Sequence, residues 1–134
     1  MIYIDSNIFI YAFTNINVIG TKASALLDAL VRGQINAVTS YITFDEVFWK
    51  LSKKFPREKA LEYTKNFLQT PHLTFVPVDN EVVLKSYELL RQYKIDPRDA
   101  IHAATAIITG AVVISEDNDF SQIKEIKTKK LSDY

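Results

Sequence analysis

The 134-residue sequence contains no cysteine. Disulfide frameworks, thiolate metal ligands and cysteine nucleophiles are therefore excluded, and a metal site must use oxygen or nitrogen ligands. Glycine is scarce, with three residues, and neither a Gly-rich phosphate loop nor a Walker pattern is present. The longest apolar stretch, 100–114, is too short to span a bilayer and is interrupted by polar residues and a glycine.

The sequence also lacks net charge, because 16 Lys and Arg balance 16 Asp and Glu. A general electrostatic attraction to nucleic acid is absent, so such binding must use local basic patches. Two basic patches are present, within 50–59 and 124–130. Both are expected to be ordinary solvent-exposed surface, because basic side chains usually stay exposed. Since an apolar strand begins at Ile2 with no leader before it, we expect a cytoplasmic protein.

Apolar, β-branched segments alternate with helical patterns along the chain. We expect strands near 2–5, 36–39, 73–78 and 111–115, with a weakly indicated fifth at 123–127. Helices are expected over 7–13, 22–32, 41–54, 56–68, 80–93 and 97–109. This order predicts an α/β fold, a three-layer α/β/α sandwich with a mostly parallel central sheet. We expect one domain over 1–134, with a loose tail from Thr128.

Four carboxylates stand where predicted strands end or helices begin: Asp5, Glu46, Asp99 and Asp117. In a parallel sheet these positions share one edge, so the acids are expected to converge there. Each acid also has an ordinary interpretation. Asp5 can cap a helix, while Glu46 and Asp99 can each complete a capping box. Because capping does not require a shared edge, their common placement favours a site.

Neighbouring carboxylates repel, by roughly 4 kcal/mol for two charges about 4 Å apart at an effective dielectric of about 20. A hard divalent cation would relieve this repulsion. Oxygen ligands suit Mg²⁺ or Mn²⁺, which also engage phosphate oxygens. Asp119, two residues after Asp117, can ligate a metal, orient a metal-bound water or form a turn. The chemistry indicated is metal-assisted hydrolysis of a phosphodiester, with one or two ions.

The sequence resembles PIN-domain ribonucleases, particularly VapC toxins, over essentially its whole length. The segments that carry the resemblance are Ile4-Asp5-Ser6-Asn7, Glu46, Arg98-Asp99-Ala100-Ile101-His102-Ala103-Ala104-Thr105-Ala106 and Ser115-Glu116-Asp117-Asn118-Asp119-Phe120. The resemblance implies Mg²⁺- or Mn²⁺-dependent cleavage of RNA. It places Asp5, Glu46, Asp99 and Asp117 in the metal-binding acidic site, with Asp119 as an additional acid.

The same resemblance assigns supporting residues and partners. Ser6, Asn7 and Ser115 match polar positions beside the acids, where they can bond carboxylates, water or phosphate; capping or turn formation is their ordinary role. VapC-like proteins commonly form homodimers and are held inactive by an antitoxin that blocks the site. A standalone PIN nuclease in RNA processing shares the same acids and is an alternative.

Three further functions share part of this pattern. A phosphoacceptor signalling domain needs another strand-end aspartate, for which Asp79 is the only candidate, and a paired lysine that is not evident. A haloacid-dehalogenase-like phosphotransferase needs Asp-x-Asp after the first strand, whereas the sequence reads Asp5-Ser6-Asn7. A non-catalytic RNA- or protein-binding module of the same fold would not need the full set of acids.

His102, Arg98 and a group of apolar residues each have two possible roles, one structural and one functional. His102, one helical turn beyond Asp99, can be a hydrogen-bonded packing residue or a member of the site. Arg98 can reach a phosphate or point into water. A group of apolar residues can belong to the core or form a homodimer or antitoxin groove: Phe9, Ile10, Phe13, Phe44, Phe48, Trp49 and Leu51.

Overall fold

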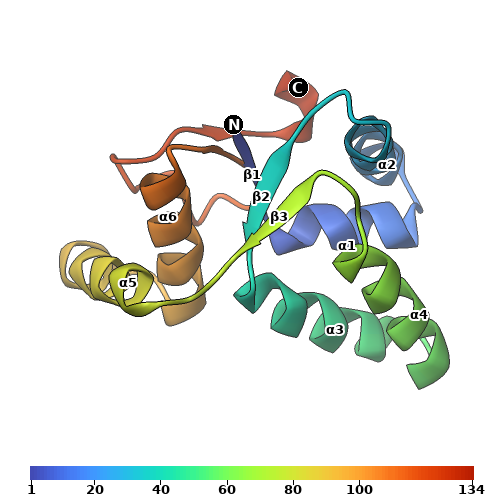
Figure 1. Ribbon diagram of the computed structural model, residues 1–134, viewed down its shortest axis with the longest axis horizontal. Helices are drawn as coiled ribbons and strands as arrows, with labels where there is room; N and C mark the ends of the chain where they lie inside the picture. Colours follow the sequence, from blue (N-terminus) through green and yellow to red (C-terminus); the bar gives the residue numbers. More distant parts are fainter.

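The computed structural model describes residues 1–134 and contains one central sheet of five parallel strands (Figure 1). The strands are β1 (Ile2–Ile4), β2 (Ala37–Ser40), β3 (Leu73–Val76), β4 (Val112–Ile114) and β5 (Thr128–Lys129). Their spatial order is β3-β2-β1-β4-β5, so β1 is the middle strand and lies between β2 and β4. The predicted α/β fold with a parallel sheet is confirmed.

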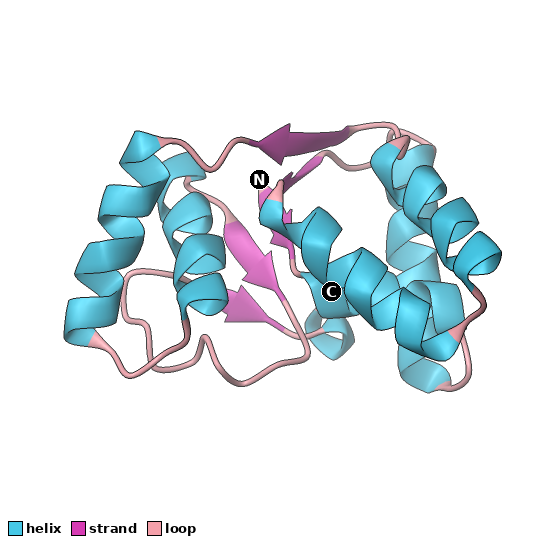
Figure 2. Cartoon of the chain, turned by 90° about the horizontal axis from the view of Figure 1, so that it is seen from below, coloured by secondary structure: helices cyan, strands magenta, loops and turns pink.

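Six helices cover the two faces of the sheet: α1 (Ser6–Thr14), α2 (Val18–Val31), α3 (Ile42–Lys54), α4 (Arg57–Leu68), α5 (Asn80–Gln92) and α6 (Pro97–Thr109). The core accordingly has two parts. One contains Phe9 and Phe67 from α1 and α4, and the other contains Leu89 and Ala103 from α5 and α6. Helices α5 and α6 lie on one side of the sheet, and the remaining helices lie on the opposite side (Figure 1 and Figure 2). None of these helices has the length and apolarity needed to cross a membrane.

Local sequence signals explain where the helix that carries Asp99 begins and ends. Asp96 precedes α6 and accepts a hydrogen bond from the main-chain N–H of Asp99 (3.0 Å), with Pro97 at the first helical position. The helix ends at Gly110, whose φ of 68° lies in the left-handed region that favours glycine. Asp99 is thereby fixed in the first turn, at the edge of the sheet.

The C-terminal segment differs from the sequence-based expectation. The fifth strand is Thr128–Lys129 rather than 123–127, and it pairs with β4. Ile123 is only 1% exposed but lies in a loop between two turns, so its apolar side chain signals burial rather than a strand. The expectation of a loose tail from Thr128 is also wrong: β5 joins the sheet, and Leu131 is buried in the core at the start of the 3-10 helix η1 (Leu131–Asp133).

The second helix begins one turn earlier than the expected Lys22. Asn17 caps α2 by accepting a hydrogen bond from the N–H of Gly20 at 3.0 Å. The first turn of α2 contains Val18, which is exposed, and Ile19, which is half-buried. Because these apolar residues do not both face the core, the sequence pattern does not show where the helix begins. This difference does not affect the position of the acids.

Candidate functional site

The acids predicted to converge do lie after strands β1, β2 and β4. Asp5 directly follows β1 and caps α1, accepting a hydrogen bond from the N–H of Ser6 at 2.8 Å. Glu46 lies in the second turn of α3, which follows β2. Asp99 occupies the first turn of α6, and Asp117 lies in the loop after β4. The parallel topology thus brings helix starts and strand ends to one edge.

Asp5, Glu46 and His102 form the tightest part of this site. One potential ligand atom from each residue lies within 4.8 Å of the other two. The Nε2 atom of His102 forms a hydrogen bond with Glu46 Oε1 and lies 3.8 Å from Asp5 Oδ1. Asp5 and His102 are buried, whereas the Glu46 side chain is 15% exposed. Asp99, Asp117 and Asp119 lie outside this tight group.

Asn7 and Ser115 hold the Asp5 carboxylate. The Ser115 hydroxyl donates to Asp5 Oδ2 at 2.7 Å, and Asn7 Nδ2 donates to the same oxygen at 3.1 Å. Asn7 Nδ2 also lies 3.0 Å from Ser115 Oγ, which links the two residues. Ser6 contributes its main-chain N–H to Oδ1. Three donors from two chain segments therefore orient Asp5 for a ligand.

Asp117 and Asp119 lie on an exposed loop after β4. Asp117 Oδ1 accepts a hydrogen bond from the N–H of Asp119 at 3.0 Å, so the turn is made by the side chain of Asp117 rather than of Asp119. The neighbouring Asp117 carboxylate is the main factor that raises the pKa of Asp119, and burial adds to this effect. This loop adds two carboxylates at the solvent side of the site.

The carboxylates of the site are electrostatically strained. Burial raises the pKa of Asp5, although His102 and the bond from Ser115 act in the opposite direction. Burial also raises the pKa of Asp99 to about 7, and the charges of Asp96 and Asp119 add to this effect. None of the acids of the site forms an ion pair with lysine or arginine. A bound cation would therefore relieve a repulsion that only His102 offsets within the protein.

Two ordinary interpretations of the acids do not hold. Glu46 does not complete a capping box with Thr43 in α3, because the only hydrogen bond of its carboxylate is with His102. In α6, Asp96 accepts the N–H of Asp99, but no reciprocal bond from the N–H of Asp96 to the Asp99 side chain completes a capping box. Arg98 pairs with Asp45 of α3 at 3.0 Å, with both side chains exposed, rather than with an acid of the site.

The donor set fits a hard divalent cation. Carboxylate oxygens come from five acids (Asp5, Glu46, Asp99, Asp117 and Asp119), and the Oε2 atom of Glu46 has no hydrogen-bond donor within the protein. All-oxygen donors of this kind suit Mg²⁺ or Mn²⁺. The one nearby nitrogen, His102 Nε2, already faces Glu46. The arrangement can hold a cation against a phosphate group and orient a water molecule beside it.

His102 is the residue whose place the sequence did not determine. It is fully buried, as a packing residue would be, but its ring contacts Glu46 and not only the core. Burial by itself lowers the pKa of His102, and the bond with Glu46 and the charge of Asp5 more than offset this and raise it. The available signal was its position three residues after Asp99, which places both on one helix face. Tyr3, which contacts the other ring nitrogen, gave no signal beyond an apolar strand.

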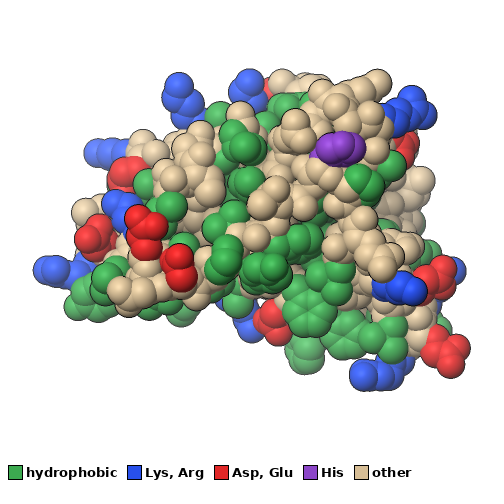
Figure 3. Space-filling model, in the orientation of Figure 1, with side chains coloured by type: hydrophobic (Ala, Val, Ile, Leu, Met, Phe, Trp, Pro, Cys, Tyr) green, Lys and Arg blue, Asp and Glu red, His purple; other side chains and the backbone are tan.

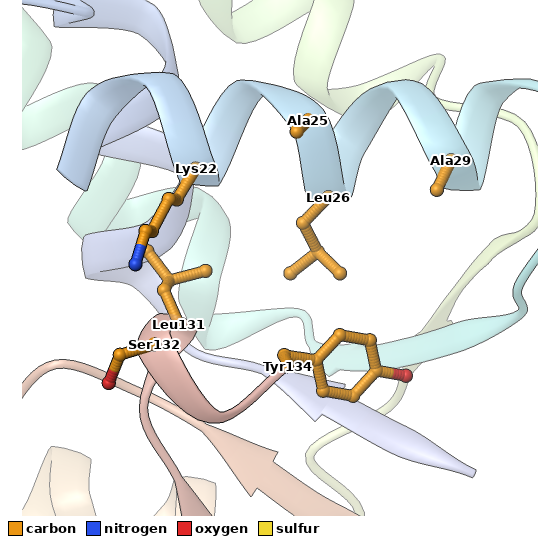
Figure 4. Close-up of a pocket in the computed structure, with 7 residues that line it drawn as sticks. All are labelled: Lys22, Ala25, Leu26, Ala29, Leu131, Ser132 and Tyr134. Carbon is orange, nitrogen blue, oxygen red and sulfur yellow. The ribbon is translucent and has the colours of Figure 1, made fainter. Parts of the chain in front are cut away.

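Two hollows on the surface differ in their relation to the acids. One of about 280 Å³, between α2 and the C-terminal turn, is lined by Lys22, Ala25, Leu26, Ala29, Leu131, Ser132 and Tyr134 (Figure 4). It contains no carboxylate side chain and is separate from the site. A second hollow of about 230 Å³ is lined only by polar residues, including Ser115, Asp117 and Lys130. Lys130 Nζ there donates to the carbonyl of Glu116 and to Asn118 Oδ1.

Comparison with known proteins gives one family. The model of the PIN domain family matches residues 2–126. A search of curated protein sequences gave no match.

Three solved structures illustrate the similarity in fold. VapBC2 from Rickettsia felis, bound to a DNA fragment from its promoter, has 20% identity and a TM-score of 0.78, covering 97% of this chain and 98% of that one. VapC20 from Mycobacterium tuberculosis, a sarcin-ricin loop cleaving toxin, has 16% identity and a TM-score of 0.74, with coverage of 92% and 95%. A toxin-antitoxin complex from Klebsiella pneumoniae has 21% identity and a TM-score of 0.68, with coverage of 94% and 95%.

Proposed function

The chain belongs to the PIN domain family, and on that premise we propose that it is a Mg²⁺- or Mn²⁺-dependent endoribonuclease, the toxin of a toxin-antitoxin pair. The observation that carries the proposal is the cluster of carboxylates around buried Asp5 and half-buried Glu46, which no lysine or arginine neutralises. A site built only to stabilise the fold would gain nothing from this repulsion. We also propose that residues 1–134 act as one domain, since a single sheet includes strands from both ends of the chain.

Each acid has a proposed role. Asp5, Glu46, Asp99 and Asp117 would hold the cation, and Asp119 would add a ligand or orient the attacking water from the exposed loop. When bound, the cation lowers the pKa of water and stabilises charge on the phosphate and the leaving oxygen. Asn7 and Ser115 keep Asp5 in position through the hydrogen bonds described above. Ser6 contributes its main-chain N–H.

RNA is proposed as the substrate for two reasons. One structurally similar protein is a sarcin-ricin loop cleaving toxin, although at 16% identity it shows only a shared fold. The polar hollow beside Asp117 includes the basic residues Lys129 and Lys130, which offer contacts for a phosphate backbone. These local contacts supply the attraction that the neutral net charge does not.

An antitoxin is the proposed protein partner. Several similar structures are toxin-antitoxin complexes. An apolar groove of about 390 Å³ between α3 and α4 is lined by Phe44, Phe48, Arg57, Leu61, Thr64, Lys65 and Leu68. Figure 3 shows hydrophobic side chains gathered over these two helices. Such a groove fits an apolar helix, and its two basic residues favour a segment that also carries acids.

A homodimer is also proposed. Four exposed hydrophobic residues occupy one face of α5: Val83, Leu84, Tyr87 and Leu90. Their spacing matches a stripe along a helix, which a second copy of the chain would cover. The mass of the purified protein in solution, measured by light scattering, tests this proposal.

Incubation of the purified protein with varied RNAs tests the nuclease proposal. We expect cleavage with Mn²⁺ and none with EDTA. Asp5→Ala should lose at least about 100-fold of the rate, because a metal ligand and the centre of a hydrogen-bond network are removed. Asp28→Asn, which removes a carboxylate on the exposed side of α2, is the matched control and should cleave normally. Equal rates for Asp5→Ala and wild type would trace the cleavage to a contaminant and refute the proposal.

A further inference from the structure

A line of hydrogen-bonded side chains runs from the core to the acidic site. Tyr3, in the middle of β1, is fully buried, and its hydroxyl forms a hydrogen bond with His102 Nδ1. The other ring nitrogen of His102 forms a hydrogen bond with Glu46 Oε1. The N–H of Ser40 donates to the Tyr3 hydroxyl at 3.2 Å and fixes the inner end of the line. Both ring nitrogens of His102 are therefore engaged.

The direction of these bonds follows from the other partner of Tyr3. The Tyr3 hydroxyl oxygen accepts the N–H of Ser40 and still has its own proton to donate, for which His102 Nδ1 is the acceptor. The Nε2 atom then carries a proton and donates it to Glu46. A bare Nε2 lone pair in that place would face a carboxylate oxygen and be repelled.

Glu46 depends on this line more than Asp5 does. Asp5 accepts bonds from Ser6, Asn7 and Ser115, whereas the only hydrogen bond of the Glu46 carboxylate is the one from His102. Glutamate also has one more rotatable bond than aspartate, so an unrestrained Glu46 would lose more conformational entropy on binding a cation.

We propose that Tyr3 and His102 are positioning residues that hold the Glu46 carboxylate in its cation-binding orientation. The proposal rests on the proposed function, since it deepens the role of the same site. His102 acts as a donor to a ligand, and Tyr3 fixes the ring that donates. Partners of this kind, one shell outside a metal, typically change metal affinity by about 10- to 100-fold when removed.

The competing role for His102 is direct ligation of the cation through Nε2. Loss of the Tyr3 hydroxyl releases the ring in either case, because that hydroxyl bonds the ring nitrogen opposite the carboxylates. Tyr3→Phe therefore tests whether the line matters for the cation. The two roles of His102 are separated by whether its effect depends on Glu46.

The test compares the Mn²⁺ affinity of Tyr3→Phe with that of the wild type, by calorimetry without RNA. We expect Tyr3→Phe to bind Mn²⁺ about 10-fold more weakly. Tyr93→Phe is the matched control, since the Tyr93 hydroxyl also bonds a side chain, that of Glu125, and accepts a main-chain N–H at 3.2 Å, that of Lys124, away from the acids. Its Mn²⁺ affinity should equal that of the wild type. A Tyr3→Phe affinity within twofold of wild type would overturn the proposal.

A double-mutant cycle keeps the proposal testable even if Tyr3→Phe does not fold. His102→Ala should weaken Mn²⁺ binding in the wild type but have no further effect once Glu46→Gln is present, because it acts through Glu46. Full additivity would assign His102 as a separate ligand and overturn the proposal. If the wild type cleaves no RNA but Tyr3→Phe loses Mn²⁺ affinity, only the nuclease proposal is refuted. If the wild type cleaves RNA but Tyr3→Phe keeps its Mn²⁺ affinity, only the positioning proposal is refuted.

Discussion

Asp99→Asn offers a sharp test of the acidic site because it should affect stability and metal binding in opposite directions. In the folded protein without metal, burial and the charges of Asp96 and Asp119 raise the pKa of Asp99 from 3.8 to about 7. The folded protein therefore binds more protons than the unfolded chain between about pH 4 and pH 7. Its stability should fall as pH rises through that window, and this contribution should be fully unfavourable above pH 7.

The size of the effect follows from the shift and the exposure of the group. A shift of roughly 3 units corresponds to about 4 kcal/mol at most. Asp99 is only half-buried, and solvent screening reduces this to about 2 kcal/mol. The loss of a carboxylate in the first turn of α6 costs about 0.5 kcal/mol through the helix dipole. We therefore expect Asp99→Asn to raise the free energy of unfolding by about 1 to 2 kcal/mol at pH 8.

Urea denaturation with EDTA at pH 8 and pH 5 measures this gain. The advantage of Asp99→Asn should shrink at pH 5, where the folded wild type keeps Asp99 protonated. With Mg²⁺ at about 100 times its Kd, the wild type should gain about 2.7 kcal/mol that the variant largely lacks, so the order of stability should invert. A variant that is less stable than wild type at pH 8 in EDTA would refute the account of Asp99 as a repelling member of the site.

Three further predictions concern other parts of the molecule. Leu131→Ala should lower the free energy of unfolding by about 2 to 3 kcal/mol in urea denaturation, because Leu131 is 4% exposed in the core; no change would mean that the tail is loose. Leu61→Glu, at a groove residue that is 47% exposed, should leave the melting temperature and RNA cleavage unchanged but weaken antitoxin binding in calorimetry; unchanged binding would place the antitoxin elsewhere. Arg98→Ala should change the free energy of unfolding by less than about 1 kcal/mol, because its pair with Asp45 is exposed; a larger loss would show a structural role for the pair.

The sequence predicted the parts of the site that follow from topology. Asp5 follows a buried strand and Asp99 follows a helix-start signal, so a parallel sheet alone places them at one edge. The position of Glu46 was predicted from the same topology, but its hydrogen bond with His102 was not predicted. The strand Thr128–Lys129 was missed because its side chains are exposed and polar, and it is held by main-chain pairing with β4, which leaves no pattern in the sequence.

The line from Tyr3 through His102 could not be predicted for a different reason. His102 lies 99 positions from Tyr3 and 56 positions from Glu46, and Tyr3 and His102 are each plausible core residues alone. Only the packing of α3 and α6 against each other and against β2, the neighbour of β1, brings the three side chains into contact. Such a contact depends on side-chain geometry, which neither periodicity nor capping signals encode.

The neutral net charge has a different meaning once the site is located. Five of the 16 acids belong to the proposed site, so the other 11 stand against 16 Lys and Arg, an excess of five positive charges on the rest of the protein. A cation held by the five acids would offset part of their charge. The metal-bound protein would then carry a net positive charge and attract a polyanion. Metal binding would thus both complete the catalytic group and remove the main local repulsion against RNA. Substrate affinity should depend on the metal as strongly as the chemistry does, because the same carboxylates control both.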